Sequence, residues 1–178
     1  DAVLVFAKKL LPGVKSFGVL YNPGEADDVA TTRALQEAAK RAGLEFRPVS
    51  VDSVNDITQR AQLLNGIGFI YITGSNLVQS AIPAVAAAMQ RMKVPVISSE
   101  TELIKKDMAD ASYAVSFESV GANAARVAVR ALKGEPTSTL PVMKPAKSDY
   151  VTSISRGQFA KLGLTIPKSF EGCGCLIN

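Results

Sequence analysis

Short apolar runs recur along the chain and are separated by longer, more polar stretches. The first run, residues 17–21, is continuous enough to indicate a strand buried on both faces. Further strands are expected at 44–51, 67–72, 94–98, 113–117 and 150–154. Pro48 removes a backbone donor from the second of these strands, which favours a position at the sheet edge.

The stretches between these runs carry apolar residues at spacings of three and four, as is typical of amphipathic helices. Helices are expected at 1–10, 27–42, 52–64, 74–92, 99–106, 119–133 and 155–162. Asp27 or Asp28 is expected to cap the second helix. Pro83 lies within the fourth, either in its first turns or at a kink. The sixth is expected to bury a stripe of Ala125, Ala128, Val129 and Leu132.

Strand and helix alternate in units of roughly 25 residues, and such units pair their strands in parallel through right-handed crossovers. The sequence therefore predicts an α/β fold: a doubly wound, mostly parallel sheet with helices on both faces. At 178 residues, with 47% hydrophobic residues, the chain suits one ordinary domain.

Composition narrows the function classes. No apolar run approaches the ~18 residues of a membrane span. The net charge is +4, but lysine and arginine are scattered, so no nucleic-acid partner is expected. No signal peptide is evident, as would also be true of a mature exported protein.

Residues that carry chemistry are scarce. Histidine is absent, which removes histidine-based triads and histidine metal ligands. The glycines at 65–68 precede a predicted strand, so they do not form a phosphate loop. Cys173 and Cys175 lie in a tail that is expected to fray, and two thiols alone cannot complete a zinc site. No catalytic residue, metal or cofactor is predicted.

Three polar segments each follow a predicted strand and open a helix: 22–28, 74–77 and 99–102. In open parallel sheets, ligands bind at the carboxyl ends of the strands, where helix amino ends supply free N–H donors. We therefore expect these segments to converge and to line a ligand site. The candidate ligand-binding residues in them are Asn22, Asp28, Ser75, Asn76, Glu100 and Thr101.

An ordered series of segments resembles a known family. "LLPGVKSFGVLYNPGEA", "AVRALKGE" and "KLGLTIP" are similar to blocks in the periplasmic-type substrate-binding proteins of ABC importers, in the branch for aromatic amino-acid uptake. The resemblance spans residues 11–167. It implies a periplasmic or otherwise extracytoplasmic protein that binds an amino-acid-like ligand without catalysis. The resemblance is compatible with a full-length form anchored to the membrane as a lipoprotein. It further implies delivery of the ligand to the importer's membrane subunits.

Family members clamp their ligand between two α/β lobes, and this chain matches only the second. The resemblance divides it into a residual helix or linker (1–10), a ligand-binding lobe (11–117), a crossover helix (118–134), a closing strand and helix (135–167) and a tail (168–178). Without a first lobe, the crossover helix would expose its apolar stripe, pack on the remaining sheet or pair with a second copy.

The resemblance also suggests residue roles. An acidic side chain of the second lobe pairs with the ligand's ammonium group in related receptors, and Glu100 falls at a compatible strand end. Asp27 and Asp28 replace the asparagine and serine that are more common in relatives. Two carboxylates suit an ammonium group rather than a carboxylate. Phe117 stands where relatives often carry tyrosine and would stack on a ligand ring.

Each candidate has a purely structural alternative. Glu100 and Thr101 would cap a short helix, as would Ser75 and Asn76, and Phe117 would pack in the core. Two other functions also remain open. The chain could be the ligand-sensing domain of a regulator or receptor, because the same fold serves effector recognition, or an enzyme with a flavodoxin-like sheet.

Overall fold

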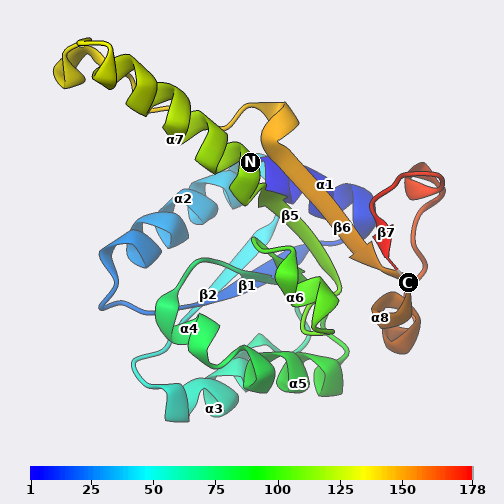
Figure 1. Cartoon of the computed structure of the whole chain (residues 1–178). Helices are drawn as coiled ribbons and strands as arrows, with labels where there is room; N and C mark the ends of the chain where they lie inside the picture. The colour runs from blue at the N-terminus through cyan, green and yellow to red at the C-terminus, as the bar shows by residue number, and fades with distance from the viewer. Residues whose placement is uncertain (178) are drawn as a thin grey trace.

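A twisted sheet forms the centre of the molecule, with helices on both of its faces and a long arm extending from one end (Figure 1). The computed structural model describes residues 1–177. The strands lie in the order β2-β1-β3-β4-β5-β6-β7. Their bounds are Ser16–Tyr21 (β1), Glu45–Ser50 (β2), Ile70–Ile72 (β3), Val96–Ser98 (β4), Ala111–Val115 (β5), Tyr150–Ser155 (β6) and Leu176–Ile177 (β7).

Strands β1 to β5 pair in parallel, which confirms the predicted α/β class. Strand β6 is the exception and runs antiparallel to β5, with Val115 opposite Tyr150. The chain therefore leaves the sheet at the end of β5 and re-enters it beside the same point. The short β7 then pairs in parallel with β6.

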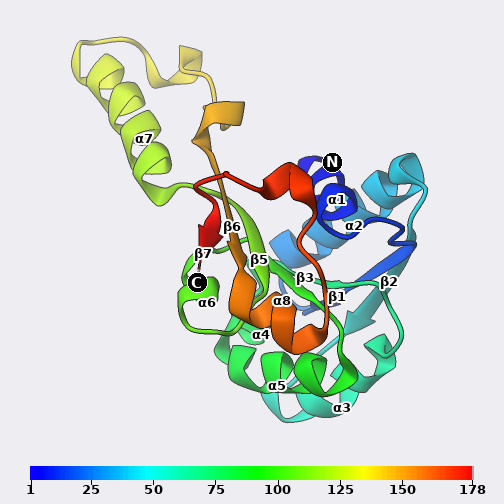
Figure 2. The same cartoon turned by 90° about the vertical axis from the view of Figure 1, so that its right-hand side faces the viewer.

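The helices cover the two faces of the sheet, as expected of a doubly wound fold (Figure 2). Helices α1, α2 and α8 contribute to the core on one face, and α3 to α6 to the core on the other. Their bounds are Ala2–Leu10 (α1), Ala26–Ala42 (α2), Ile57–Ala61 (α3), Asn76–Ser80 (α4), Ile82–Met92 (α5), Glu102–Lys105 (α6), Phe117–Leu132 (α7) and Arg156–Leu162 (α8). None of the helices in residues 1–177 is long and apolar enough to cross a membrane.

An aromatic stack organises the core under α1 and α2. Phe17 on β1 is fully buried, and its ring centroid lies 4.9 Å from that of Phe46 and 5.2 Å from that of Phe69. Tyr71 packs against the same core, and burial raises the pKa of its phenol to about 12. Helix α1 belongs to this core as well, since Phe6 stacks on Tyr113. Residues 1–10 are thus an integral part of this unit.

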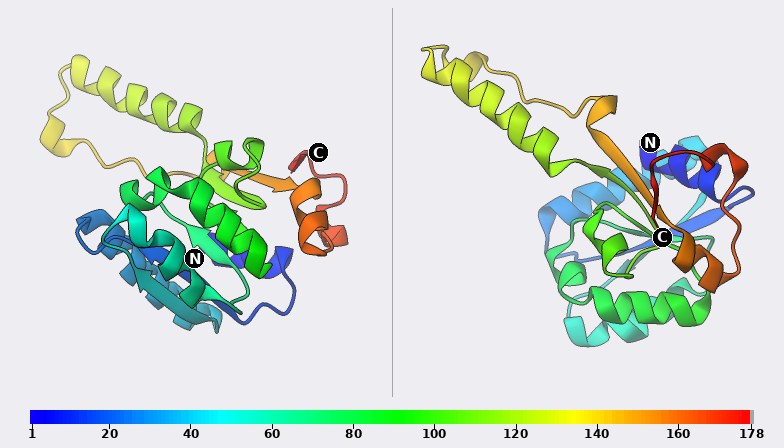
Figure 3. Two further views of the ribbon diagram at one scale, coloured as in Figure 1. Left: turned by 90° about the horizontal axis from the view of Figure 1, so that it is seen from below. Right: turned by 45° about the vertical axis from the view of Figure 1, so that its right-hand side comes forward.

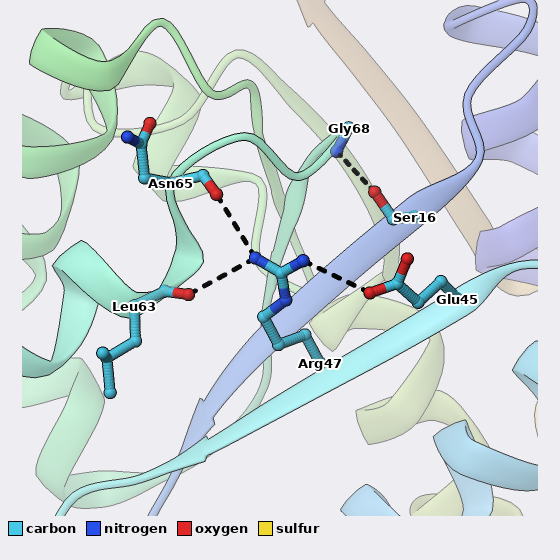
Figure 4. A network of polar contacts seen from close by, with 6 residues as sticks. All are labelled: Ser16, Glu45, Arg47, Leu63, Asn65 and Gly68. Atoms are coloured by element: carbon cyan, nitrogen blue, oxygen red, sulfur yellow. Dashed lines mark hydrogen bonds and ion pairs between the residues drawn. The ribbon is translucent and has the colours of Figure 1, made fainter.

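Arg47 anchors strand β2, which lies at the sheet edge as Pro48 indicated. Its guanidinium donates to the carbonyl oxygens of Leu63 (3.5 Å) and Asn65 (3.2 Å) and pairs with Glu45 at 3.2 Å (Figure 4). Charged side chains and a proline on an edge strand discourage pairing with another chain.

Gly68 has a packing role, consistent with its position before a strand. Its N–H donates to the backbone oxygen of Ser16 at 3.1 Å and to the hydroxyl at 3.2 Å (Figure 4). A Cβ at this position would lie 2.3 Å from a methyl of Val14 and 2.7 Å from the Ser16 carbonyl oxygen. Only glycine allows this approach to β1.

Several element boundaries differ from the sequence predictions. The helix expected at 74–92 is two helices, because the chain breaks at Ala81 and Pro83 occupies the first turn of α5. The helix expected at 52–64 is α3 flanked by two 3-10 turns. The strand expected at 113–117 is Ala111–Val115, and Phe117 already belongs to α7.

The prediction of a frayed tail is wrong for residues 168–177. Leu176 and Ile177 form β7 on the open edge of β6, and the Ile154 N–H donates to the Cys175 oxygen at 2.8 Å. Cys173 and Cys175 form a disulfide, and Cys175 packs against the core. The apolar pair at 176–177 explains the order, because it has both an edge to pair with and a core to contact. Residue 178 lies outside the described residues.

Helix α7 and the segment that follows it form the arm, residues 117–149, which extends away from the sheet (Figure 3). The stripe expected to be buried is not: no residue of α7 is buried, and Leu132 is 87% exposed. The helix faces a groove of about 560 Å³, lined by Val120, Asn123, Ala124, Val127, Ala128, Pro141, Val142, Met143 and Pro145. Of the three arrangements considered for this helix, the chain adopts the exposed one.

Candidate functional site

The carboxyl ends of β1, β3, β4 and β5 lie at one edge of the sheet, because these strands are parallel. The connections that leave them form what we call the rim, residues 22–28, 73–79, 98–102 and 116–117. The strand order reverses between β1 and β3, and a crevice opens at such a switch point in α/β sheets. Hydrogen bonds join the first three segments, which confirms that they converge.

Asp28 joins the first segment to the second. Its side chain is 3% exposed and accepts hydrogen bonds from the Asn22 N–H at 2.6 Å and the Thr73 hydroxyl at 3.2 Å. Both oxygens are therefore engaged within the rim, where they fix the distance between the ends of β1 and β3. In this arrangement Asp28 is a buried residue that holds the rim segments in place.

The cap predicted for α2 is wrong. The helix begins at Ala26, with Glu25 in the N-cap position and no capping bond from a side chain. The side-chain oxygen of Asn22 accepts a hydrogen bond from the Gly24 N–H at 2.9 Å. The tight turn that this bond closes starts the helix before either aspartate. Asp28 consequently points back to the end of β1.

Glu25 caps a different helix. Its carboxylate accepts hydrogen bonds from the N–H groups of Asn76 (2.8 Å) and Leu77 (3.1 Å) at the start of α4, and from the Asn22 amide at 3.0 Å. These bonds, with the Asn76 backbone bond the largest, hold the pKa of Glu25 below its ordinary value. The amino end of α4 thus already holds an anion supplied by the chain.

Gln79 joins the second segment to the third. Its amide donates to the Thr73 carbonyl oxygen at 2.9 Å and to Oε1 of Glu100 at 3.0 Å. The Glu100 backbone N–H in turn donates to the Ser98 hydroxyl at 2.9 Å. Among residues 1–177, no group donates a hydrogen bond to Oε2 of Glu100. The side chain is therefore held in place with one oxygen still able to accept.

The remaining rim candidates do not cap helices with their side chains. Ser75 stands at the N-cap position of α4, but its hydroxyl is buried and has no hydrogen-bond partner among the described residues. Thr101 occupies the N-cap of α6 without a side-chain bond. Asn76 is exposed and its amide contacts Glu25 at 3.3 Å. Glu25 replaces the serine as the cap of α4.

Phe117 does not pack in the core, contrary to the structural alternative. It begins α7 directly after β5 and is 78% exposed. The Ser116 hydroxyl accepts from the Ser119 N–H at 3.4 Å and so fixes the start of the helix. Since β4 and β5 are neighbours, the ring lies on the same edge as the segment that carries Glu100.

Sequence reasoning missed Glu25, Thr73 and Gln79, which make most of the contacts between rim segments. A signal existed for Glu25, since it directly follows the turn residues Pro23 and Gly24 and opens a helix. Gln79 gives no comparable signal, because its partners lie 6 and 21 residues away along the chain.

The charge of the rim decides which chemistry it can recognise. Its first three segments contain Glu25, Asp27, Asp28, Glu100 and Glu102 and no lysine or arginine. A carboxylate ligand would meet repulsion here, whereas an ammonium group would find acceptors. The described residues hold no group of three or more side chains suited to a metal ion.

Comparisons with known proteins agree with this geometry. A family model for "ABC transporter substrate binding protein" matches residues 3–171. A tyrosine-binding protein of Clostridioides difficile (strain R20291) is 28% identical over 143 residues, which are 80% of this chain and 41% of that protein.

Solved structures are similar over nearly the whole chain. The ABC domain from Streptococcus pneumonia in complex with L-Trp matches with a TM-score of 0.83 and 26% identity over 98% of this chain and 59% of its own. A ligand-free, open substrate binding protein with adhesive properties from Clostridium difficile matches with a TM-score of 0.78 and 27% identity. This match covers 98% of this chain and 58% of that protein's chain. The chain spans about half the length of these relatives. It belongs to the ABC transporter substrate-binding protein family.

Proposed function

We propose that this chain forms one wall of the ligand site of an ABC importer's solute-binding protein and that it binds an amino acid without chemical change. The observation that carries the proposal is the convergence of three rim segments through Glu25, Asp28 and Gln79. Such a network holds the polar groups in place before the ligand arrives, which lowers the entropy cost of binding.

The ligand's ammonium group would bind at Glu100, whose free oxygen and acidic surroundings favour a cation. The side chain of the ligand would stack on Phe117, which is exposed at the neighbouring strand end. An aromatic amino acid fits this arrangement, and it agrees with relatives that are named for tyrosine or were solved with L-Trp. Asn22, Asp28, Ser75, Asn76 and Thr101 would shape the wall around it.

The rest of the protein would supply the opposite wall and cover the arm. The relatives are about twice as long as the matched region, and the apolar groove of the arm needs a partner. In the 178-residue chain alone, a second copy would take that place and produce concentration-dependent self-association, detectable by sedimentation. Val142→Ser should weaken this self-association, because Val142 lines the groove and is 88% exposed.

The working protein would act outside the cytoplasm and would pass its ligand to the membrane subunits of the importer. Substrate-binding proteins of this family are typically extracytoplasmic.

Thermal denaturation of the complete two-lobe protein with amino acids tests the proposal. A ligand at 100 times its dissociation constant adds about 2.7 kcal/mol to stability, so tyrosine or tryptophan should raise the melting temperature by several degrees. Glu100→Gln should weaken binding by about tenfold or more, and Phe117→Ala by about threefold to tenfold.

Glu37→Gln is the matched control, because Glu37 is exposed on α2, pairs with Lys40 and lies outside the rim. Equal losses at Glu100 and Glu37 would count against the proposed ammonium site. The 178-residue chain alone should bind weakly or undetectably, since half the contact surface is missing. Tight binding by this chain would contradict the two-wall arrangement.

A further inference from the structure

A cavity of about 230 Å³ lies at the end of the sheet opposite the rim. Val96 begins β4 and Asp110 directly precedes β5, so the cavity opens at the amino ends of these strands. Helix α5 and helix α8 form its sides. Its lining includes Ala86, Ala87, Asp107, Asp110, Gln158 and Lys161.

Asp110 supplies a buried carboxylate to this cavity. The residue is 8% exposed, and its backbone is fixed on both sides by hydrogen bonds with Val96 and Ser155, each at 2.9 Å. Oδ2 accepts from the Val96 N–H at 2.6 Å, but no group among residues 1–177 donates to Oδ1. Burial raises the pKa of this carboxyl to about 6, and nearby Lys161 acts in the opposite direction. The second oxygen is therefore able to accept a hydrogen bond from a molecule in the cavity.

Gln158 supplies a second acceptor. It is 7% exposed, and its amide nitrogen donates to the Asp107 carbonyl oxygen at 3.2 Å. The Ser155 hydroxyl accepts from the Gln158 backbone N–H at 3.2 Å, which fixes the start of α8. No described residue donates to the side-chain oxygen of Gln158. Two anchored, buried side chains thus each bring an unused acceptor to one cavity.

The charged groups around the cavity are few. Lys161 lines it from α8 and Asp107 from the connection before β5, whereas the lining residues of α5 and β4 are uncharged. Lys161 would repel a simple cation but would attract the carboxylate of a zwitterion. The volume is below the ~300–1,000 Å³ of sites for larger ligands, while one water molecule takes only about 30 Å³. The space suits a small molecule.

We propose that this cavity is a second binding site, separate from the rim, for a small zwitterion with an ammonium group and a carboxylate, of the size of glycine or alanine. The ammonium group donates to Oδ1 of Asp110 and to the side-chain oxygen of Gln158. The carboxylate faces Lys161 at the mouth.

Titration of the ¹⁵N-labelled 178-residue chain with glycine at millimolar concentrations tests this site, with methylammonium and acetate as probes of each half. Glycine should shift the amide resonances of Ala86, Asp110 and Gln158 and leave those of the rim unchanged. Methylammonium and acetate should each bind at least several-fold more weakly than glycine. Absence of saturable shifts at the cavity, as expected if it holds water only, would overturn the proposal.

Two variants test whether the glycine shifts come from binding in the cavity rather than from a general effect of glycine on the protein. Asp110→Asn keeps an acceptor for the Val96 N–H but removes the charge, and Ala86→Leu fills the cavity without touching a polar group. Each should abolish the glycine shifts, whereas Asp56→Asn on the exposed surface should preserve them. Unchanged binding in folded Ala86→Leu would overturn the proposal even if Asp110→Asn fails to fold. Glu100→Gln should bind glycine here normally, so this result stands apart from the proposed function.

Acidity gives an independent readout. Glycine binding requires the ionised carboxylate, so the affinity should fall about tenfold for each pH unit below about 6 in the original chain. In the chain without ligand, the raised pKa means that the cost of burying the charge is absent below pH ~4 and fully present above pH ~6. Asp110→Asn should remove this fall in stability with rising pH. A glycine affinity that is constant between pH 5 and 8, an interval on both sides of that pKa, would contradict the role of Asp110.

Discussion

Helices α5 and α7 are both amphipathic, but only α5 buries its apolar face. Ile82, Val85, Ala88 and Met89 of α5 pack against the sheet, whereas α7 has no buried residue. The difference lies in their surroundings, since the sheet covers one face of α5, whereas the segment 141–145 lines a groove beside α7 but buries none of its residues. An amphipathic pattern therefore predicts that a helix face is covered, but it does not indicate whether the covering residues belong to the same chain.

The largest expected contrast is between a core side chain and an arm side chain. Phe17→Ala should lower the free energy of unfolding by about 3–5 kcal/mol, because it empties the centre of the aromatic stack. Leu132→Ala should change it by less than about 0.5 kcal/mol, because Leu132 is exposed. Urea unfolding of the 178-residue chain measures both. In the complete protein, Leu132→Ala should cost about 2 kcal/mol or more if the arm is covered there.

Similar losses of unfolding free energy for both variants in the isolated chain would show that the arm is packed. That result would contradict the contrast between α5 and α7. A negligible effect of Leu132→Ala in the complete protein would instead show that Leu132 stays exposed there.

Two glycines provide a smaller contrast of opposite sign. Gly68→Ala should destabilise the chain by about 1–3 kcal/mol, because the new methyl group meets Val14 and the Ser16 carbonyl oxygen. Gly121→Ala on α7 should favour the helix by about 0.5–1 kcal/mol, since its Cβ would meet no atom within 4 Å. Hydrogen exchange separates the effects: the first variant should accelerate exchange throughout the sheet, and the second should slow it in α7 only. Slower exchange in the sheet of Gly68→Ala would be the contrary result.

Substitutions in the rim should change stability less than those in the core and more than those in the exposed arm. Glu25→Gln should cost about 1 kcal/mol, because a neutral amide accepts more weakly from the Asn76 and Leu77 N–H groups. The pKa of Glu25 is lowered in the folded state, so its contribution is present above the ordinary value of 4.5 and is lost as the pH falls through the lower folded value. The difference between the two proteins should therefore shrink below pH ~4.5.

Glu37→Gln serves as the control for Glu25→Gln, because Glu37 is exposed and pairs with Lys40 three residues away. Stability curves of all three proteins between pH 3 and 7, an interval on both sides of the glutamate pKa, measure the effect. A difference for Glu25→Gln that grows in acid would contradict the assigned sign.

The sheet and the meeting of the rim segments were predictable because they depend on local patterns. Apolar runs specify strands, and parallel strands place their following loops at one edge. The start of α2 was not predictable in the same way, because the turn at Asn22 and the Thr73 contact of Asp28 decide it together. The order of the tail depends on a distant strand edge, which no local pattern at 168–177 reveals.

The site is less accessible to sequence reasoning than the fold. The position of Glu100 after a strand predicts its place in the site, but the contact with Gln79, which holds it, is visible only in three dimensions. The exposure of Phe117 depends on α7 leaving the sheet, and its residue type alone would indicate burial.

The pairing of β5 with β6 gives the arm two attachment points that lie side by side. Val115 pairs with Tyr150, and the Ser116 N–H donates to the Asp149 oxygen at 2.8 Å. The arm is thus an insertion with adjacent ends, and a short turn in its place would leave both strands intact. For the same reason, any displacement of the arm acts on β5 and β6 at once rather than on a single flexible linker.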